Sequence, residues 1–168
     1  SESDRQTFSI VKNNDLSKIL KKNLSRNKLV KFQKDKDLKE IKKKNYNLII
    51  NCDLNHQISK KFFFKRIKKD YFSFAYTTII NHNKEIKNDI AIQIFTKNGP
   101  IAFLPISNTQ TSIVFSLRNP INKYFDDSEI RRLIDKFNPK YKINKIGIIS
   151  KFKLNSSHLR NYYQDNIL

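Results

Sequence analysis

The spacing of apolar residues over positions 13–24 predicts an amphipathic helix. Leucine and isoleucine recur there every three or four residues, which places them on one face of a helix with 3.6 residues per turn. Asn13 or Asn14 is suited to cap its start. Phe8–Lys12 is a candidate for a short strand, and Leu29–Phe32 is expected to be extended. The predicted apolar face consists of Leu16, Ile19, Leu20 and Leu24.

A continuous apolar run, Tyr46–Cys52, predicts a buried parallel strand that ends on Asp53. Strands of parallel sheets are covered on both faces, so they lack the alternation of polar and apolar residues seen in half-buried strands. A short helix is expected next, over Asn55–Phe64. Its Ile58 and Phe62 are four residues apart and therefore share one face.

From Asp70 onward the apolar spacing changes from helical to alternating, which predicts strands. Asn98-Gly99 lies between two alternating runs and is a strong hairpin signal. Ser107–Gln110 supplies a second turn. Together these features predict an antiparallel meander of at least four strands. The expected strands cover residues 72–80, 90–96, 101–106 and 111–117, and Phe72, Phe74 and Tyr76 share one side of the first.

A second helix is predicted over residues 126–137. Asp126 and Glu129 have the spacing of a capping box, and Pro139 ends the helix. A last strand is expected over Tyr141–Leu154. The predicted fold class is therefore α+β, close to α/β, with a curved antiparallel sheet beside one strand of parallel type. The apolar face of the second helix consists of Ile130, Leu133, Ile134 and Phe137.

The composition is that of one folded domain. A chain of 168 residues with 38% hydrophobic residues is large enough to bury a core. No apolar run approaches the roughly 20 residues of a membrane span, and the N-terminus does not resemble a signal peptide. Cys52 is the only cysteine, which excludes an internal disulfide and a CxxC zinc site, and the three histidines lack paired spacing. We expect a cytoplasmic protein cut at both ends, because the chain starts on Ser and stops within an apolar run.

The net charge of +19 has two explanations. Clustered Lys and Arg favour a polyanionic partner. However, 27 of the 34 basic residues are Lys, and 20 Asn and 24 Ile accompany only 2 Gly, which is the bias of an A/T-rich coding sequence. We favour this compositional explanation. Residues 60–72, KKFFFKRIKKDYF, interleave basic and aromatic residues as some single-strand binders do. A helix end with Phe62 and Phe63 packed inward is the commoner arrangement.

Residues 88–117, NDIAIQIFTKNGPIAFLPISNTQTSIVFSL, resemble a segment of the FAD-dependent aromatic hydroxylases of ubiquinone biosynthesis, relatives of p-hydroxybenzoate hydroxylase. That segment has the pattern A-x-Q-x-F, then GP-x-A-x-LP-x and a serine-rich strand. Gly99, Pro100 and Pro105 fall in phase with it. Thirty residues in phase make this the most specific part of the resemblance.

Two further segments are similar to motifs of the same family. Residues 48–61 resemble its DGxxSxxR motif with Asp53 at the aspartate, and residues 9–20 resemble its V-E-N-R-x-L segment with Asn13 near the flavin. The resemblance implies that Asp53 and Asn13 contact FAD. The glycine-rich GxGxxG loop, which binds the FAD pyrophosphate at a helix N-terminus, is absent. Departures from the DGxxSxxR motif are Leu54, Gln57 and Lys60, where glycine, serine and arginine are usual.

The resemblance implies that this is the middle segment of a monooxygenase, inactive by itself. Residues 1–64 would belong to the FAD-binding domain, 65–154 would form the substrate-binding sheet, and 155–168 would return toward the FAD-binding domain. The complete enzyme would hydroxylate a polyprenylated phenol in ubiquinone biosynthesis with FAD, O2 and NADPH or NADH. No residue of the chain is expected to be catalytic. The candidate substrate walls are Phe72, Phe74, Tyr76, Phe95, Phe103 and Pro105.

Two classes of function therefore remain open. The first is the monooxygenase, whose expected partners are the polyprenyl phenol, other proteins of ubiquinone biosynthesis and, through a basic flank, anionic lipid at the inner membrane surface. Nucleic acid is not expected as its partner. The alternative is a non-enzymatic basic module that uses residues 60–69 to bind nucleic acid or an anionic membrane.

Overall fold

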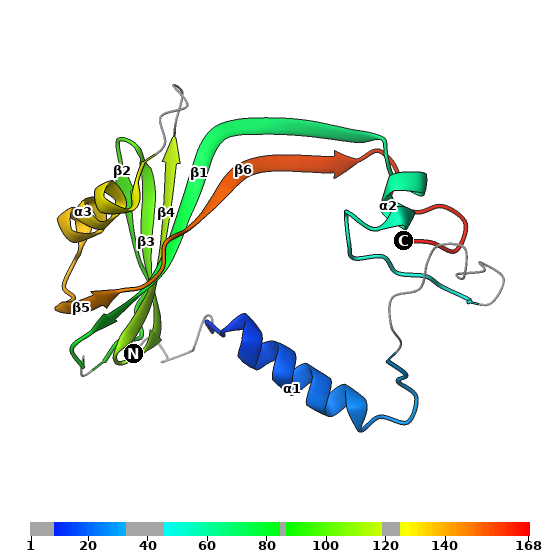
Figure 1. The fold of residues 1–168 in the computed structure, drawn as a ribbon, viewed down its shortest axis with the longest axis horizontal. Helices are drawn as coiled ribbons and strands as arrows, with labels where there is room; N and C mark the ends of the chain where they lie inside the picture. The colour runs from blue at the N-terminus through cyan, green and yellow to red at the C-terminus, as the bar shows by residue number, and fades with distance from the viewer. Residues whose placement is uncertain (1–8, 33–45, 85–86, 119–124) are drawn as a thin grey trace, which may run out of the picture. The chain divides into compact units, whose positions relative to one another are not determined.

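The computed structural model describes residues 9–32, 46–84, 87–118 and 125–168. The chain divides into two compact units, unit 1 (Ser1–Leu16 and Asp70–Asn155) and unit 2 (Ser17–Lys69 and Ser156–Leu168). The roles predicted for residues 1–64, 65–154 and 155–168 stay predictions. The helices and strands of the described residues (Figure 1) are α1 (Asn13–Ser25), α2 (Gln57–Phe62), β1 (Arg66–His82), β2 (Ile92–Thr96), β3 (Gly99–Ser107), β4 (Gln110–Arg118), α3 (Asp127–Phe137), β5 (Ile143–Ile146) and β6 (Ser150–Leu159).

The strands form a six-stranded sheet, most of it in unit 1. Its strand order is β2-β3-β4-β1-β5, and β6 also pairs with β1. Strands β4 and β1 pair antiparallel from Ser73↔Arg118 to Asn81↔Gln110, and β3 pairs antiparallel with both β2 and β4. The α+β class and the antiparallel meander predicted from the alternating pattern are confirmed.

The core of unit 1 lies between one face of this sheet and α3, which packs against it (Figure 1). Because side chains alternate along a strand, alternate residues of β3, β4 and the part of β1 that pairs with β4 lie on this face. Phe103 and Phe115 are fully buried there. The opposite face carries small residues such as Ala75 and Ser116. The buried apolar residues of the core are Tyr76, Ile80, Ile101, Phe103, Ile113, Phe115, Leu117, Ile130, Ile134 and Tyr141.

Helix α3 begins with the predicted capping box. The Asp126 carboxylate accepts from the Glu129 N–H at 2.8 Å, and the Glu129 carboxylate accepts from the Asp126 N–H at 3.0 Å. The Ser128 hydroxyl, with the Glu129 N–H, holds the pKa of Asp126 below its usual value. This box, the bounds of the helix and its buried face are as the sequence predicts.

The predicted hairpin is present, but its turn is one residue earlier than Asn98-Gly99. The turn residues are Lys97 and Asn98, and Gly99 pairs with Thr96 as the first residue of β3. Gly99 has φ +134°, and a Cβ atom there would lie 2.0 Å from the Ser116 carbonyl oxygen. Glycine is thus required for the close approach of β4 rather than for the turn itself.

Two segments predicted to be strands, Phe8–Lys12 and Tyr46–Cys52, are not strands, and the segment predicted to be extended, Leu29–Phe32, forms no strand either. Ser9–Lys12 and residues 29–32 contain no strand, and Phe8 lies outside the described residues. Tyr46–Cys52 makes one parallel bridge, Ile49↔Ile167, and Ile50 is 67% exposed. A parallel strand is buried only when strands flank it and helices cover it, and among the described residues the backbone of this run pairs only with the end of the chain.

The strand predicted over Tyr141–Leu154 is divided into β5 and β6. The Gly147 N–H between them donates to the Ile79 carbonyl at 2.9 Å, and Ile148 is exposed. Strand β1 is also longer than predicted, since it starts at Arg66 rather than near Asp70. Both differences arise because β1 offers pairing partners that local spacing does not reveal.

Unit 2 has a smaller core around α2. Ile58, Phe63 and Ile167 are buried together, and Phe62 and Ile49 pack against them. The His56 ring caps α2 by accepting from the Ile58 N–H at 3.2 Å. The inward packing predicted for Phe62 and Phe63 is therefore confirmed. Helix α1 also forms where the sequence predicts it, although none of its residues is buried.

Candidate functional site

The strands place the predicted substrate walls on different faces of the sheet. Phe74, Tyr76 and Phe103 lie on the face that α3 covers, where Phe74 packs against the buried core and the other two belong to it. Phe103 stacks on Tyr141 with ring centroids 5.9 Å apart. The surroundings of these rings are thus protein side chains.

The other three predicted walls are more accessible. Phe95 is 80% exposed and lies opposite Pro100, on the face away from α3. Phe72 is exposed and has φ +48°, which is rare for an aromatic residue. Pro105 is half-buried opposite Thr111. The structure therefore does not gather the six predicted residues into one site, and their roles stay predictions.

An open groove lies in unit 1 beside the β2–β3 turn. It measures about 890 Å³ out to open solvent and has a mainly apolar lining. Its one charged lining residue is Arg118, the cross-strand partner of Ser73. The lining residues are Tyr71, Ser73, Asn98, Gly99, Pro100, Ser116, Arg118 and Leu154.

Local polar contacts surround Phe72, whose neighbours Tyr71 and Ser73 line this groove. The Asp70 carboxylate pairs with Lys153 and accepts from the Phe72 N–H at 2.9 Å. These two contacts, with Lys153 the stronger, keep the pKa of Asp70 below its usual value. The unusual φ of Phe72 therefore coincides with an ionised Asp70 at neutral pH.

A buried polar network also lies in unit 1, and sequence reasoning missed it. His82 Nε2 lies 3.0 Å from Thr111 Oγ1, and the Asn88 amide donates to the same oxygen at 3.1 Å. The Tyr141 hydroxyl donates to Asn88 Oδ1 at 2.9 Å. All four residues are buried. Each has a polar partner, so the network is suited to holding β1, β4 and β5 in register rather than to binding a ligand. The only signal in the sequence was polar residues at inward-facing strand positions.

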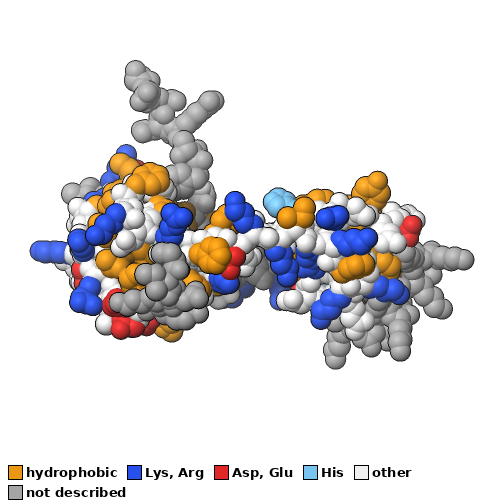
Figure 2. Space-filling view, turned by 90° about the horizontal axis from the view of Figure 1, so that it is seen from above, with side chains coloured by type: hydrophobic (Ala, Val, Ile, Leu, Met, Phe, Trp, Pro, Cys, Tyr) orange, Lys and Arg blue, Asp and Glu red, His pale blue; other side chains and the backbone are white. Residues whose placement is uncertain are grey.

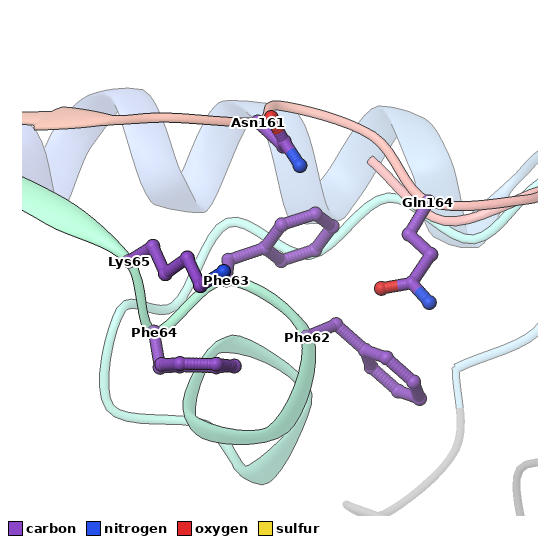
Figure 3. A pocket seen from close by; sticks show the side chains of 6 residues that line it. All are labelled: Phe62, Phe63, Phe64, Lys65, Asn161 and Gln164. Atoms are coloured by element: carbon purple, nitrogen blue, oxygen red, sulfur yellow. The ribbon is translucent and has the colours of Figure 1, made fainter.

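Unit 2 has a second pocket, at the end of α2 (Figure 3). It measures about 460 Å³ out to open solvent. Figure 3 shows the Asn161 amide directed toward the Phe63 ring and the Gln164 amide beside the space between the Phe62 and Phe63 rings. Phe63 is 4% exposed and Phe64 is 63% exposed. The lining residues are Phe62, Phe63, Phe64, Lys65, Asn161 and Gln164.

The two residues predicted to contact FAD lie in different units, and their role stays a prediction. Asp53 is exposed, its carboxylate accepts from the Asn55 N–H, and its carbonyl accepts from Asn51 and Ser59. Asn13 is the exposed first residue of α1 and belongs to the other unit. Neither glycine of the sequence lies at a helix N-terminus, where a pyrophosphate would bind. The two glycines therefore form no phosphate-binding turn of the GxGxxG kind.

Within the described ranges, no group of three or more His, Cys, Asp or Glu side chains is placed to hold a metal ion. The helices of the same residues are all too short or too polar to cross a membrane.

Comparison with solved structures shows a likeness in fold. The flavin-dependent halogenase CmlS matches with a TM-score of 0.50 and 13% identity, over 71% of this chain and 24% of that one. At this identity the likeness concerns the fold alone. Two further structures match less well. The anhydrotetracycline hydroxylase OxyS from Streptomyces rimosus has a TM-score of 0.44 and 11% identity over 72% of this chain and 25% of that one. The tetracycline destructase Tet(51) has a TM-score of 0.42 and 15% identity over 73% of this chain and 36% of that one.

This chain spans about a quarter of the length of the halogenase chain that it matches. The sequence matches no protein-family model and no curated protein.

Proposed function

We propose that this chain is the sheet-bearing portion of a FAD-dependent aromatic-ring monooxygenase. One observation carries the proposal. Residues 88–117, which resemble the hydroxylase segment, fold into β2, β3 and β4 of a sheet whose fold is like that of a flavin-dependent halogenase. The resemblance in residues and the likeness in fold thus concern the same part of the chain.

In this proposal the chain contributes to the substrate pocket, and other parts of the enzyme bind the flavin phosphates. FAD, with NADPH or NADH as reductant and O2 as oxidant, supplies the hydroxylation chemistry when bound. The open groove beside the β2–β3 turn supplies apolar surface that excludes water and orients a ring. Its apolar lining suits a polyprenylated phenol of ubiquinone biosynthesis, and the exposed ring of Phe95 extends the same face of the sheet.

The experiment uses the protein expressed from its complete reading frame. We expect the purified protein to show the visible absorbance of bound flavin. It should also oxidise NAD(P)H and consume O2 faster when a polyprenyl phenol is added, and the product should gain one oxygen atom by mass spectrometry. A folded protein that retains no flavin and oxidises no NAD(P)H would overturn the proposal.

A variant tests the assignment of the groove face. Phe95→Ala should raise KM for the phenol and leave the flavin content unchanged, because Phe95 lies on the substrate side of the sheet and the flavin phosphates bind elsewhere. Phe64→Ala, which removes an exposed ring in unit 2, is the matched control and should leave KM unchanged. Equal effects of the two variants on KM would argue against the groove.

A further inference from the structure

We infer that unit 2 carries a binding surface for single-stranded nucleic acid, centred on the pocket of Figure 3. The inference rests on contacts within unit 2 and does not depend on the proposed monooxygenase activity. The surface is formed by the exposed Phe64 ring, two amides and a run of lysines that the oxidation chemistry does not use.

The aromatic part of the surface arises where α2 ends. The helix stops at Phe62, Phe63 turns into the core of unit 2, and Phe64 is left with 63% of its surface exposed. An exposed ring beside a buried one presents a flat apolar face to solvent. Nucleic-acid bases stack on such faces with about 1–3 kcal/mol per base, which corresponds to roughly 5- to 150-fold in affinity.

The amides supply polar groups that a base edge can use. Asn161 and Gln164 are exposed, and Figure 3 shows the Asn161 amide directed toward the Phe63 ring and the Gln164 amide beside the space between the Phe62 and Phe63 rings. Backbone hydrogen bonds of 2.9 and 3.0 Å between Gln164 and Ile167 hold this segment in place. Each amide offers a donor and an acceptor, as base edges require. Lipid tails would leave these amides without hydrogen-bond partners, so a base fits the pocket better than a bilayer does.

The charge beside the rings suits a phosphate backbone. Residues 60–69 carry six basic side chains and no acidic one, and the described acids of unit 2 are Asp53 and Asp165. Lys65 Nζ lies 5.9 Å from the centre of the Phe64 ring, and Lys61 Nζ lies 5.4 Å from that of Phe62. Figure 2 shows basic and hydrophobic side chains intermingled on the right-hand body, which contains unit 2. A phosphate can thus be neutralised next to a stacked base.

This arrangement of rings and lysines predicts binding to single strands of many different base sequences. Stacking on a ring is available to every base, and lysines recognise phosphates without reading bases. The one arginine of this run, Arg66, donates to the carbonyls of Phe63 and Leu54 at 3.2 and 3.3 Å, so its guanidinium stabilises the end of α2 rather than reading a base.

The experiment measures the affinity of the whole chain for fluorescently labelled oligo-dT and oligo-U at several salt concentrations. A net charge of +19 attracts any polyanion, so the decisive variant is one that removes a ring and no charge. Phe64→Ala should weaken binding by roughly 5- to 150-fold with an unchanged salt slope. Phe95→Ala, with an exposed ring in unit 1, is the matched control and should bind like the wild type. Comparing oligo-dT with oligo-U distinguishes DNA from RNA as the ligand.

Two more variants separate the contribution of the amides from that of the lysines. Asn161→Ala combined with Gln164→Ala should also weaken binding. A triple variant, with Lys60, Lys61 and Lys65 each changed to Gln, should reduce the salt slope by about 0.7 for each phosphate that is no longer neutralised. Far-UV circular dichroism checks that each variant is folded.

Two results would overturn the inference. One is equal affinity of wild type and Phe64→Ala at every salt concentration, which would mean that charge alone binds the oligonucleotide. The other is weak binding of oligonucleotides together with Phe64-dependent binding to vesicles of anionic lipid, which would identify a membrane surface instead.

Discussion

Replacing Gly99 by alanine should destabilise unit 1 far more than the same replacement at Gly147. Gly99 has φ +134°, a conformation that side chains disfavour, and its new Cβ would lie 2.0 Å from the Ser116 carbonyl oxygen. At Gly147 the φ is ordinary and the nearest atom, the Ile79 carbonyl oxygen, would lie 3.0 Å away. Alanine at position 99 therefore requires the hairpin to move away from β4, whereas alanine at position 147 requires its neighbour to shift by only a few tenths of an ångström.

The expected loss can be estimated from two contributions. Forcing a residue with a side chain into a sparsely populated backbone region costs about 1–3 kcal/mol. Inserting a methyl group where the backbone of a neighbouring strand already lies costs about 1–3 kcal/mol more. The sum for Gly99→Ala, about 2–6 kcal/mol, is a large fraction of the roughly 5–15 kcal/mol that stabilises a typical domain. Gly147→Ala should cost about 1 kcal/mol.

Urea unfolding tests this difference. Because the chain has two compact units, the amide NMR signals of β3 and β4 should be followed, so that the free energy of unfolding is that of unit 1. Gly99→Ala should lower the urea midpoint strongly at an unchanged slope, and Gly147→Ala only slightly. The reasoning would be refuted if Gly99→Ala lay within about 0.5 kcal/mol of the wild type, or if Gly147→Ala were the more damaging change.

Two further predictions concern polar groups of unit 1. Tyr141→Phe removes the hydroxyl that donates to Asn88, so it should lower the free energy of unfolding by about 1–3 kcal/mol, whereas Tyr163→Phe, at a residue 71% exposed, should change it little; equal effects in thermal melts would contradict this. The pKa of Asp126 is lowered in the folded chain, chiefly by Ser128, so its carboxylate stabilises α3 above the unfolded pKa of about 3.9, and this contribution is lost as the pH falls through the lower folded value. Melts of the wild type and Asp126→Asn should therefore differ at neutral pH and converge in strong acid, and a difference that persists there would count against the assignment.

The elements that the sequence predicts well depend on neighbours along the chain. The capping box of α3 involves residues three apart, and the hairpin at residues 97 and 98 joins two runs whose alternation is visible in a few residues. Both were predicted with nearly correct bounds. The alternation of β1 also predicted correctly that Phe74 and Tyr76 share one face. What it did not reveal was that α3 covers that face.

The segments that were predicted wrongly depend on partners far away in the sequence. Tyr46–Cys52 has the composition of a buried strand, yet among the described residues it pairs only with the end of the chain, at Ile167, and Ile50 is exposed. Three successive phenylalanines likewise looked alike, and only the end of α2 determined that Phe63 is buried and Phe64 exposed. The candidate substrate residues likewise lie on different faces of the sheet, and only the packing of α3 decides which of those faces is covered.

The sequence by itself therefore determined the local elements of this protein, its α+β class and the segment that resembles a flavin-dependent hydroxylase. The tertiary structure decided which faces of those elements are covered, why Gly99 must be glycine and where exposed rings meet lysines. The physical reason is that backbone propensity and capping act over a few residues, whereas burial is set by whatever packs against a residue from anywhere in the chain.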